Sequence, residues 1–441
     1  MPVSQDVKDH IPEDPIADAI YANYKKAGDA EPQRGYLGAS IIGHPCNRWL
    51  WYNFRQCCSE DISGRIYRLF ETGDLEEGRL SRDLESIGCT VHDADGEGEQ
   101  FEVTALGGHF SGHMDGCALG IPGAEKAWHV MEYKTHNAKS YRRLLGEGVQ
   151  KSKPQHYAQM QIYMHLTGMT RALYVAKNKD TEEIRTERVK YDRQFCAVLM
   201  EKAEWIITAT EPPPRISNRR DYYLCSWCDA NDICFGTEGL SPKPALPLKT
   251  VSCRQCCHAT PLLDREGAEW HCAKNGACAT NDWVPDMPCK DHLCLPGLFA
   301  FATVEIYDSE RKTILMKNTD DTTWPHGSDT NSYCTSDLLT LPVDLLTHDT
   351  VSYVKSTFGG KVKFSRDPLE KYSEETSRVV WRGPSAGLPA AWISKYKTDL
   401  SMQKPIERYD HTPEYDAAEM DGDILIVLWG NGIAEILEGV Q

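Results

Sequence analysis

Two carboxylates and a lysine lie in short segments that could form a metal-dependent hydrolytic site. Asp115 lies in GHMDG, and Glu132 follows in WHVMEYKTH, two residues before Lys134. Residues two apart in a strand share a face, so Glu132 and Lys134 point together and Tyr133 faces the other way. Two such carboxylates can hold Mg²⁺ or Mn²⁺, and the lysine can orient a metal-bound water or stabilise charge on a phosphate. Alone, a Glu-x-Lys pair on a strand indicates only a solvated ion pair.

Helices are expected on both sides of these strands. The upstream segment LFETGDLEEGRLSRDLESIG predicts an amphipathic helix with Leu75, Leu80 and Leu84 near one face and Glu77 at its edge. Downstream, PQHYAQMQIYMHLTG places Gln159 and Tyr163 four apart and therefore on one helix face. The periodicity predicts further helices near 15–27, 40–56, 137–148 and 191–210, and strands near 99–105, 108–115, 127–135, 171–177 and 184–190.

The order of these motifs resembles the RecB-like branch of the PD-(D/E)XK nuclease superfamily. The resemblance covers roughly residues 35–237 and rests on the helix acid, the strand Asp, the strand Glu-x-Lys and the helix Gln-x-x-x-Tyr. It implies an α/β fold with a restriction-endonuclease-like core. The site residues that it implies are Mg²⁺ or Mn²⁺ ligands at Glu77, Asp115 and Glu132, catalytic support from Lys134, and supporting roles for Gln159 and Tyr163.

One position departs from this family pattern. Many members carry a histidine four residues after a helix glycine, whereas Gly73 is followed at that spacing by Glu77. A carboxylate can still bind the ion, so activity remains plausible. Glu76 and Glu71 stay open as alternative ligands.

A first group of cysteines follows the predicted nuclease core. CSWCDANDIC holds Cys225, Cys228 and Cys234, and three thiolates need a fourth ligand from elsewhere, for which Cys46 is the candidate. Four thiolates suit a [4Fe–4S] cluster or Zn²⁺. Cys46 matches the lone N-terminal cysteine of the iron–sulfur nucleases of this branch, which include the AddB nuclease domain and nucleases of CRISPR adaptation. The resemblance therefore favours iron–sulfur, with a structural role.

A second group of cysteines follows a Pro-rich linker at 241–249, which predicts a domain boundary. A C-x2-C knuckle and two later thiols have the arrangement of a zinc ribbon, in which one tetrahedral ion replaces a core too small to fold alone. The expected zinc ligands are Cys253, Cys256, Cys272 and Cys289, and the other candidates are Cys257, His258, His271, Cys278, His292 and Cys294. Whether the ribbon touches DNA, binds a partner or is only structural stays open.

A basic stretch directly follows the catalytic strand. KSYRRLLGEGVQKSK holds five basic residues: Lys139, Arg142, Arg143, Lys151 and Lys153. Such runs are more often solvated helix faces, but their position after the catalytic strand favours contact with the DNA backbone. The aromatic segment NRWLWYNFR (47–55) could stack on unpaired bases. A helix with so many aromatic residues more often packs into the core.

Composition limits the class of protein. The chain has 441 residues, 41% hydrophobic and 26% charged, with a net charge of −17, which excludes a largely disordered chain and a general polyanion-coating protein. No apolar run reaches membrane-span length and no signal pattern begins the chain, so we expect a cytoplasmic protein without membrane association. In a reducing compartment, 17 cysteines favour metal binding over disulfides.

These observations predict four regions. They are an N-terminal helical extension (1–34), the nuclease domain (35–240), the zinc-ribbon-like module (250–297) and a small mixed α/β region with an acidic tail (298–441). In the last region FATVEIYD and KTILMKN predict strands, SDLLTLPVDLL a helix, and ILIVLWGNGIAEIL a strand and a short helix.

The predicted function is that of a metal-dependent DNA exonuclease. The resemblance implies action on DNA ends or single strands in recombination, repair or end processing, in a bacterial cell or a phage-infected host. A recombinase or single-strand-binding protein would be a natural partner, and an oligomer is compatible with this role. The alternatives are a restriction-like endonuclease and a non-catalytic DNA- or partner-binding protein on a nuclease scaffold.

Overall fold

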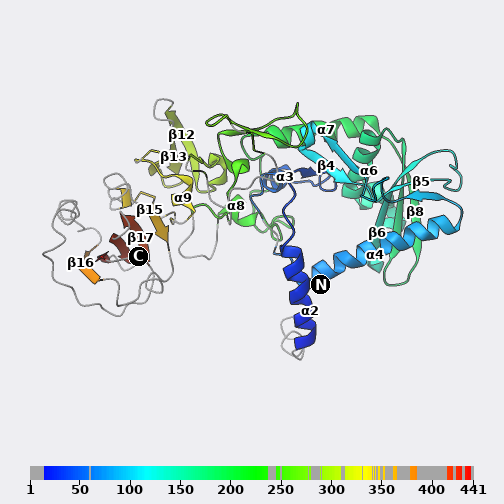
Figure 1. The fold of residues 1–441 in the computed structure, drawn as a ribbon, viewed down its shortest axis with the longest axis horizontal. Helices are drawn as coiled ribbons and strands as arrows, with labels where there is room; N and C mark the ends of the chain where they lie inside the picture. The colour runs from blue at the N-terminus through cyan, green and yellow to red at the C-terminus, as the bar shows by residue number, and fades with distance from the viewer. Residues whose placement is uncertain are drawn as a thin grey trace. The chain divides into compact units, whose positions relative to one another are not determined.

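The computed structural model describes most of the first 350 residues and isolated strands beyond them (Figure 1). The described residues are 14–58, 61–236, 245–248, 251–276, 278–279, 289, 291–308, 313–329, 331–339, 341, 343, 346–347, 351–352 and five strands within 361–438. The chain divides into two compact units. The first comprises Met1–Ala209, Pro261–Glu269 and Thr280–Asp282, and the second comprises the remainder.

A five-stranded sheet forms the centre of the first unit. Its order is β2 (Thr90–His92), β5 (Cys117–Leu119), β6 (His129–His136), β7 (Arg171–Asn178) and β8 (Ile184–Lys190). Only β6 and β7 run parallel, joined by the helices α5 (Ala138–Ser152) and α6 (Pro154–Thr167). A parallel pair needs such a crossover, which covers one face of the sheet. The mixed α/β class is therefore present in this unit.

The two faces of β6 have different environments. Tyr133 packs in a core with Leu80 and Leu84 of the long helix α4 (Gly64–Ser86), and the Ser81 hydroxyl donates to the Tyr133 hydroxyl at 3.2 Å. Fully burying each leucine stabilises the fold by roughly 1.5–3 kcal/mol. Alternation along the strand places the polar side chains of β6 on the opposite face. The core therefore fixes which residues of β6 are available for chemistry.

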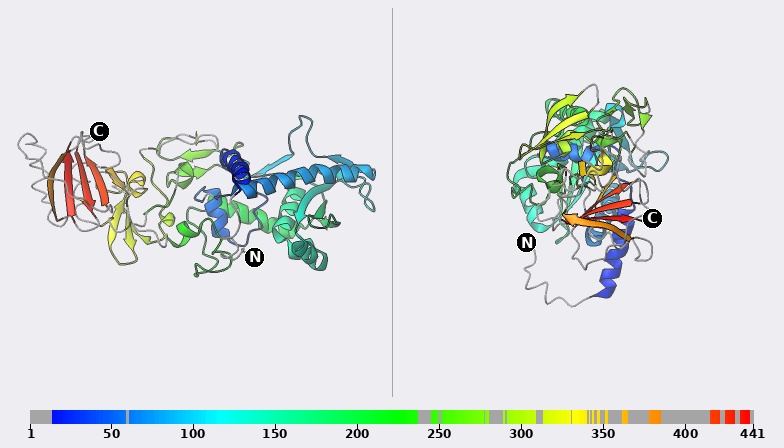
Figure 2. Two further views of the ribbon diagram at one scale, coloured as in Figure 1. Left: turned by 90° about the horizontal axis from the view of Figure 1, so that it is seen from below. Right: turned by 90° about the vertical axis from the view of Figure 1, so that its left-hand side faces the viewer.

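The predicted apolar face of this helix includes Leu75 with Leu80 and Leu84, but the side chain of Leu75 is 71% exposed and lies outside this core. The first half of α4 packs on helix α2 (Pro15–Asp29) instead of on the sheet (Figure 2). In that contact the Tyr24 hydroxyl donates to Glu71 at 2.5 Å. The apolar stripe facing the sheet thus begins only at Leu80.

A second sheet and two helices complete the first unit. The strands are β1 (Leu37–Gly38), β4 (Phe110–His113) and β3 (Glu102–Ala105), and the helices are α3 (Asn47–Phe54) and α7 (Arg193–Thr208). The predicted helix over 40–56 begins only at Asn47, because Pro45 disfavours helical backbone just before it. Trp51 of α3 is fully buried and donates to the Ala209 carbonyl at 2.9 Å. The aromatic side chains of α3 thus pack largely into the core.

A distant segment also belongs to the first unit. Pro261–Glu269 packs on the short 3-10 helix η1 (Leu106–Gly108), where the Ala268 N–H donates to the Gly107 carbonyl at 2.7 Å. Gly107 has a φ of +68°, and a Cβ there would lie 2.5 Å from the Leu262 carbonyl oxygen. His109 is 0% exposed, and its Nε2 lies 2.9 Å from the Glu269 carbonyl oxygen.

The second unit is built from small elements. The cysteine-rich part contains helix α8 (Asn231–Phe235), the 3-10 helix η2 (Cys253–Gln255) and the strands β9 (Ala259–Pro261), β10 (Trp270–Cys272) and β11 (Cys278–Ala279), of which β9 ends at the boundary of the first unit. After η3 (Pro296–Leu298) come the antiparallel strands β12 (Ala302–Asp308), β13 (Thr313–Asn318) and β14 (Thr323–His326).

The C-terminal strands form a five-stranded antiparallel sheet. They are β15 (Lys361–Phe364), β16 (Arg378–Pro384), β17 (Tyr415–Met420), β18 (Ile424–Trp429) and β19 (Ile433–Glu438), in the order β15-β17-β18-β19-β16. The predicted short helix within ILIVLWGNGIAEIL is wrong, because β18 and β19 pair as antiparallel strands. The Gly-Asn-Gly sequence between them favours a hairpin turn.

Among the described residues of the predicted helix SDLLTLPVDLL, those up to Leu338 are α-helical, as part of α9 (Thr335–Leu338). Pro342 follows and disfavours continuation. Part of that segment and most of the residues 349–359 that follow it lie outside the described residues. No helix in the described ranges is both long enough and apolar enough for a membrane span.

Candidate active site

The structure brings together the aspartate, glutamate and lysine singled out in the sequence. Asp115 lies in the turn between β4 and β5, and β5 pairs with β6. The Lys134 Nζ lies 2.8 Å from Glu132 Oε1 and 3.4 Å from Asp115 Oδ2. Asp115 Oδ2 also accepts the backbone N–H of Tyr133 at 2.8 Å. Strand β6 therefore fixes both the lysine beside the aspartate and the orientation of the aspartate itself.

Glu132 is an unusual carboxylate in this group. Its side chain is 0% exposed, its Oε1 lies 2.8 Å from the Lys134 ammonium, and its Oε2 has no hydrogen-bond partner among the described residues. Burial raises the pKa of Glu132 to about 8, since the attraction of Lys134 is opposed by the negative charge of Asp115. For Lys134, burial alone would lower the pKa, but the charges of Glu132 and Asp115 outweigh it and raise that pKa. The lysine is therefore a cation at neutral pH.

Glu77 is the carboxylate of helix α4 that interacts electrostatically with Asp115 and Lys134. Burial and then the charge of Asp115 raise the pKa of Glu77 to about 7. The alternatives are engaged elsewhere, because Glu76 Oε1 lies 2.6 Å from Lys177 Nζ and Glu71 accepts the Tyr24 hydroxyl. The geometry thus favours Glu77 over Glu76 and Glu71.

The chemistry of the donor set fits a cation. The charge of Asp115 raises the pKa values of both Glu77 and Glu132, and Glu132 Oε2 has no hydrogen-bond partner among the described residues. In this conformation the Lys134 ammonium is within ion-pair distance of both Glu132 and Asp115. Among the described residues, no three His, Cys, Asp or Glu side chains form a group that could hold a metal ion as they stand.

Helix α6 supports the turn that carries Asp115. The buried Tyr163 hydroxyl donates to the His113 carbonyl at 2.7 Å, and Gln159 Nε2 donates to that hydroxyl at 3.2 Å. The helix approaches β4 so closely that a Cβ on Gly112 would lie 2.8 Å from Tyr163 Cε1. Gln159 and Tyr163 therefore position the turn around Asp115 from within the core.

The basic residues of α5 divide into two kinds. Lys139, Arg142, Arg143 and Lys151 are exposed, although Arg143 pairs with a glutamate of the next helical turn at 3.0 Å. Lys153 is half-buried and donates from Nζ to the Ser140 hydroxyl at 2.5 Å. The first four are available to a phosphate backbone, whereas Lys153 is engaged inside the protein.

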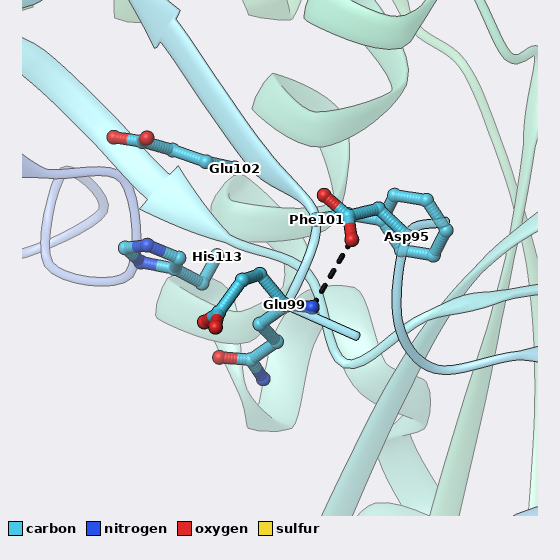
Figure 3. Close-up of a pocket in the computed structure, with 6 residues that line it drawn as sticks. Asp95, Glu99, Phe101, Glu102 and His113 are labelled. Atoms are coloured by element: carbon cyan, nitrogen blue, oxygen red, sulfur yellow. Dashed lines mark hydrogen bonds between the residues drawn. The ribbon is translucent and has the colours of Figure 1, made fainter. Parts of the chain in front are cut away.

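A cavity of about 640 Å³ adjoins His113 (Figure 3). Asp95, Glu99, Glu102 and His113 are among its lining residues, and the Asp95 carboxylate accepts the backbone N–H of Glu99 at 3.0 Å. Sequence reasoning did not single out this cavity. Its negative charge disfavours a phosphate backbone there.

The first cysteine group lies in and just before helix α8. Cys225 is buried, Cys228 and Cys234 are half-buried, and Asn231 Nδ2 donates to the Cys225 carbonyl at 2.7 Å. Cys46 caps α3 by accepting the Trp49 N–H at 3.4 Å. Cys46 belongs to the first unit and the other three to the second. The described cysteines form no disulfide.

In the second cysteine group, thiols interact electrostatically. Burial and then the negative charges of Cys272 and Cys289 raise the pKa of Cys253. Burial also raises the pKa of Cys256, with Cys253 and Cys272 adding to the effect. The thiols of Cys253, Cys256, Cys272 and Cys289 thus influence one another electrostatically, but these described side chains form no group that could hold a metal ion as they stand.

Among the other candidate ligands of the ribbon, His292 is engaged elsewhere. His292 has both ring nitrogens in hydrogen-bond distance of protein oxygens, Nδ1 at 3.0 Å from Thr335 Oγ1 and Nε2 at 2.8 Å from the Ser252 carbonyl. It is therefore not available to a metal in this conformation. The side chain of Cys278 lies outside the described residues.

Comparisons with known proteins give partial matches. No protein-family model matches the chain, and no curated protein matches it significantly. Among solved structures, SSO0001 is similar at 16% identity and a TM-score of 0.31, over 50% of this chain and 96% of that one. An alkaline exonuclease (LHK-Exo) from Laribacter hongkongensis is similar at 17% identity and a TM-score of 0.28, over 42% and 90%.

A phage-related exonuclease from Haemophilus somnus 129PT is similar at 14% identity and a TM-score of 0.24, over 31% of this chain and 68% of its own. At these scores, a function for this chain has to be argued from its own residues.

Proposed function

We propose that the chain is a divalent-metal-dependent nuclease that hydrolyses phosphodiester bonds in DNA. The observation that carries the proposal is the fully buried Glu132 carboxylate beside Asp115 and Lys134: its Oε1 lies 2.8 Å from the Lys134 ammonium, and its Oε2 has no hydrogen-bond partner among the described residues. Burying a carboxylate oxygen without a donor costs about 1–3 kcal/mol, and such groups cluster at functional sites. A cation bound between the carboxylates would offset that cost.

In the proposed mechanism, Glu77, Asp115 and Glu132 would hold Mg²⁺ or Mn²⁺. A bound ion would supply activation of a water molecule and neutralisation of charge on the phosphate. Lys134 is protonated, so it donates to the phosphate or orients the water and does not act as a general base. The Tyr133 N–H holds the Asp115 carboxylate in place, and Tyr163 holds the preceding turn.

The choice of DNA and of an exonuclease rests on the motif order and on exposed charge. The exposed cations of α5, namely Lys139, Arg142, Arg143 and Lys151, follow β6 directly and suit a phosphate backbone without reading its sequence. Lys153 contributes indirectly through Ser140. We propose DNA ends as substrate, in recombination, repair or end processing, with a recombinase or single-strand-binding protein as partner.

Cleavage of labelled DNA by anaerobically purified protein tests the proposal. Linear and covalently closed substrates, single- and double-stranded, are incubated with Mg²⁺ or Mn²⁺. We expect metal-dependent loss of linear DNA only, reduced about 100-fold or more by Lys134→Ala. Lys126→Ala, an exposed lysine just before β6, is the matched control and should retain activity. Cutting of closed circles would indicate an endonuclease, and no cleavage with any metal would indicate a non-catalytic scaffold.

Two further metal sites are part of the proposal. The mutual influence of its thiols supports Zn²⁺ at the second cysteine group: Cys253, Cys256, Cys272 and Cys289. The resemblance supports a [4Fe–4S] cluster at the first group: Cys46, Cys225, Cys228 and Cys234. Metal analysis with visible absorbance separates the two. Cys253→Ser should lose zinc and keep iron, Cys225→Ser should lose iron and keep zinc, and loss of neither metal would contradict the assignment.

A further inference from the structure

A chain of polar side chains runs from the end of α5 to the face of β6 that carries Glu132. Lys153 Nζ donates to Ser140 Oγ at 2.5 Å, and Ser140 Oγ lies 3.2 Å from His136 Nδ1. His136 Nε2 lies 2.9 Å from the Tyr174 hydroxyl, which lies 2.8 Å from His156 Nδ1. Five groups from two strands and two helices therefore form one continuous hydrogen-bonded path.

The path adjoins the candidate active site. Tyr174 is the direct partner of Glu132 in the parallel β6–β7 pair, so their side chains share a face of the sheet. After burial, the charge of Glu132 is the largest cause that raises the pKa of Tyr174. His156 begins the helix face that continues with Gln159 and Tyr163, three and seven residues later.

Both histidines of the path are neutral at pH 7. Burial lowers the pKa of His136 to about 4 and that of His156 to about 3, and the positive charge of Lys134 contributes in each case. A neutral imidazole carries one N–H, so each ring donates at one nitrogen and accepts at the other. The hydrogen bonds along a path through two such rings can therefore all donate either toward His156 or toward Lys153.

The two ends of the path select one direction. The Lys153 ammonium can only donate, so Ser140 accepts from it. If Ser140 gives its own proton to His136 Nδ1, then His136 donates from Nε2 to Tyr174, and Tyr174 donates to His156 Nδ1. The reverse direction leaves the Ser140 proton without an acceptor among the described residues. In the selected direction every proton shared between two members of the path has an acceptor, and His156 carries its proton on Nε2.

That nitrogen is the open end of the path. His156 is half-buried, and its Nδ1 accepts from the Tyr174 hydroxyl. Its Nε2 bonds to no described residue, and it is not one of the fully buried polar atoms that lack a hydrogen-bond partner. We infer that His156 donates its Nε2–H to a phosphate oxygen of the DNA strand in the site, and that the path from Lys153 holds the proton on that nitrogen. This inference rests on the proposed nuclease function. A neutral donor suits the place, because an imidazolium would be repelled by Lys134 and by a bound cation.

The first test compares two variants on one helix. His156→Phe removes the donor. His165→Phe is the matched control, because His165 also bonds through Nδ1 to a tyrosine hydroxyl at 2.8 Å. His165 is exposed and lies on the opposite side of α6 from His156. We expect kcat to fall roughly 10- to 100-fold for His156→Phe, the range for a lost hydrogen bond to a charged group, and less than twofold for His165→Phe. Equal melting temperatures exclude unfolding as the cause.

The second test asks whether the lost contact is to phosphate. Single methylphosphonates, which lack one charged oxygen, are placed along the labelled strand. A methylphosphonate at the contacted phosphate should lower the activity of the wild-type protein, and it should cause no further loss in His156→Phe. If both proteins respond equally at every position, His156 does not contact a phosphate and the inference is wrong.

The third test reads the proton directly and does not depend on cleavage. In a protein labelled with ¹⁵N-histidine, the ring signals of His156, assigned by their loss in His156→Gln, should show N–H at Nε2 and a bare Nδ1. Tyr174→Phe should remove this preference. A proton on Nδ1 would overturn the inferred direction.

The outcomes separate the two claims. A wild-type protein that cleaves, with a fully active His156→Phe, refutes this inference and leaves the nuclease. A wild-type protein that never cleaves refutes the nuclease and the phosphate contact with it.

Discussion

Removing one hydroxyl in the core should both destabilise the fold and misplace Asp115. Tyr163→Phe deletes the donor to the His113 carbonyl at 2.7 Å and the acceptor of the Gln159 amide at 3.2 Å. Tyr163 is 1% exposed and Gln159 is 5% exposed, so water cannot easily replace either bond. Leaving a buried polar group without a partner costs about 1–3 kcal/mol. Because the amide side chain can rotate partly toward other acceptors, we expect a total loss of about 2–3 kcal/mol.

Urea unfolding of the metal-free protein measures this loss as a shift of the midpoint at constant slope. Tyr191→Phe is the control, because its hydroxyl bonds to the exposed His165 on the same helix. A surface change of this kind should stay within about 0.5 kcal/mol. The first unit and the second unit are followed by separate probes, since two units can unfold in two steps.

Activity provides the second readout. Asp115 lies two residues beyond His113, so a loosened turn should lower kcat under conditions where Tyr163→Phe is fully folded. A variant as stable as the wild-type protein would show that the Tyr163 hydroxyl does not hold the turn. A destabilised variant with unchanged kcat would show that the turn does not position Asp115.

Three further results are expected. Gly112→Ala should destabilise the first unit, because its Cβ would lie 2.8 Å from Tyr163 Cε1; a thermal midpoint equal to wild type would contradict this. Folding lowers the pKa values of His136 and His156 to about 4 and 3, so the unfolded state takes up protons at a higher pH than the folded state does. As the pH is lowered from about 6.5, the free energy of unfolding should therefore decrease, by at most about 1.4 kcal/mol per pH unit for each histidine. Urea midpoints that do not change between pH 7 and pH 5 would refute it. Asp192→Ala removes the N-cap of α7 and should cost about 1 kcal/mol by the same assay, and an unchanged midpoint would count against it.

Local patterns predicted the parts of the site that lie within one element. Alternation in β6 separates Glu132 and Lys134 from Tyr133, and the structure shows this strand over His129–His136. The same local reasoning failed for Leu75, since nothing in the helix pattern indicates that α2 covers the first half of α4. It also failed in the tail, where an apolar run near a turn sequence fits either a strand or a short helix.

The hydrogen-bonded path could not be predicted in the same way. It depends on the pairing of Glu132 with Tyr174 and on the break at Gly148, whose φ of +72° ends the first part of α5. Neither the strand register nor the return of Lys153 to Ser140 follows from spacing. One signal was present, because His156 precedes Gln159 by three residues and so shares its helix face.

The contact of Pro261–Glu269 with η1 bears on how the first unit can be produced by itself. A fragment that stops at residue 240 would lack the segment Pro261–Glu269, in which the Glu269 carbonyl accepts a hydrogen bond from His109 Nε2 and Leu262 lies against Gly107. The buried His109 imidazole would lose this partner, and the Gly107 carbonyl would lose the hydrogen bond from the Ala268 N–H. Separate expression of the two halves should therefore give a poorly soluble N-terminal fragment that a peptide spanning 251–276 rescues. In this sense the first unit is completed only once the chain has been synthesised beyond Glu269, within the cysteine-rich region.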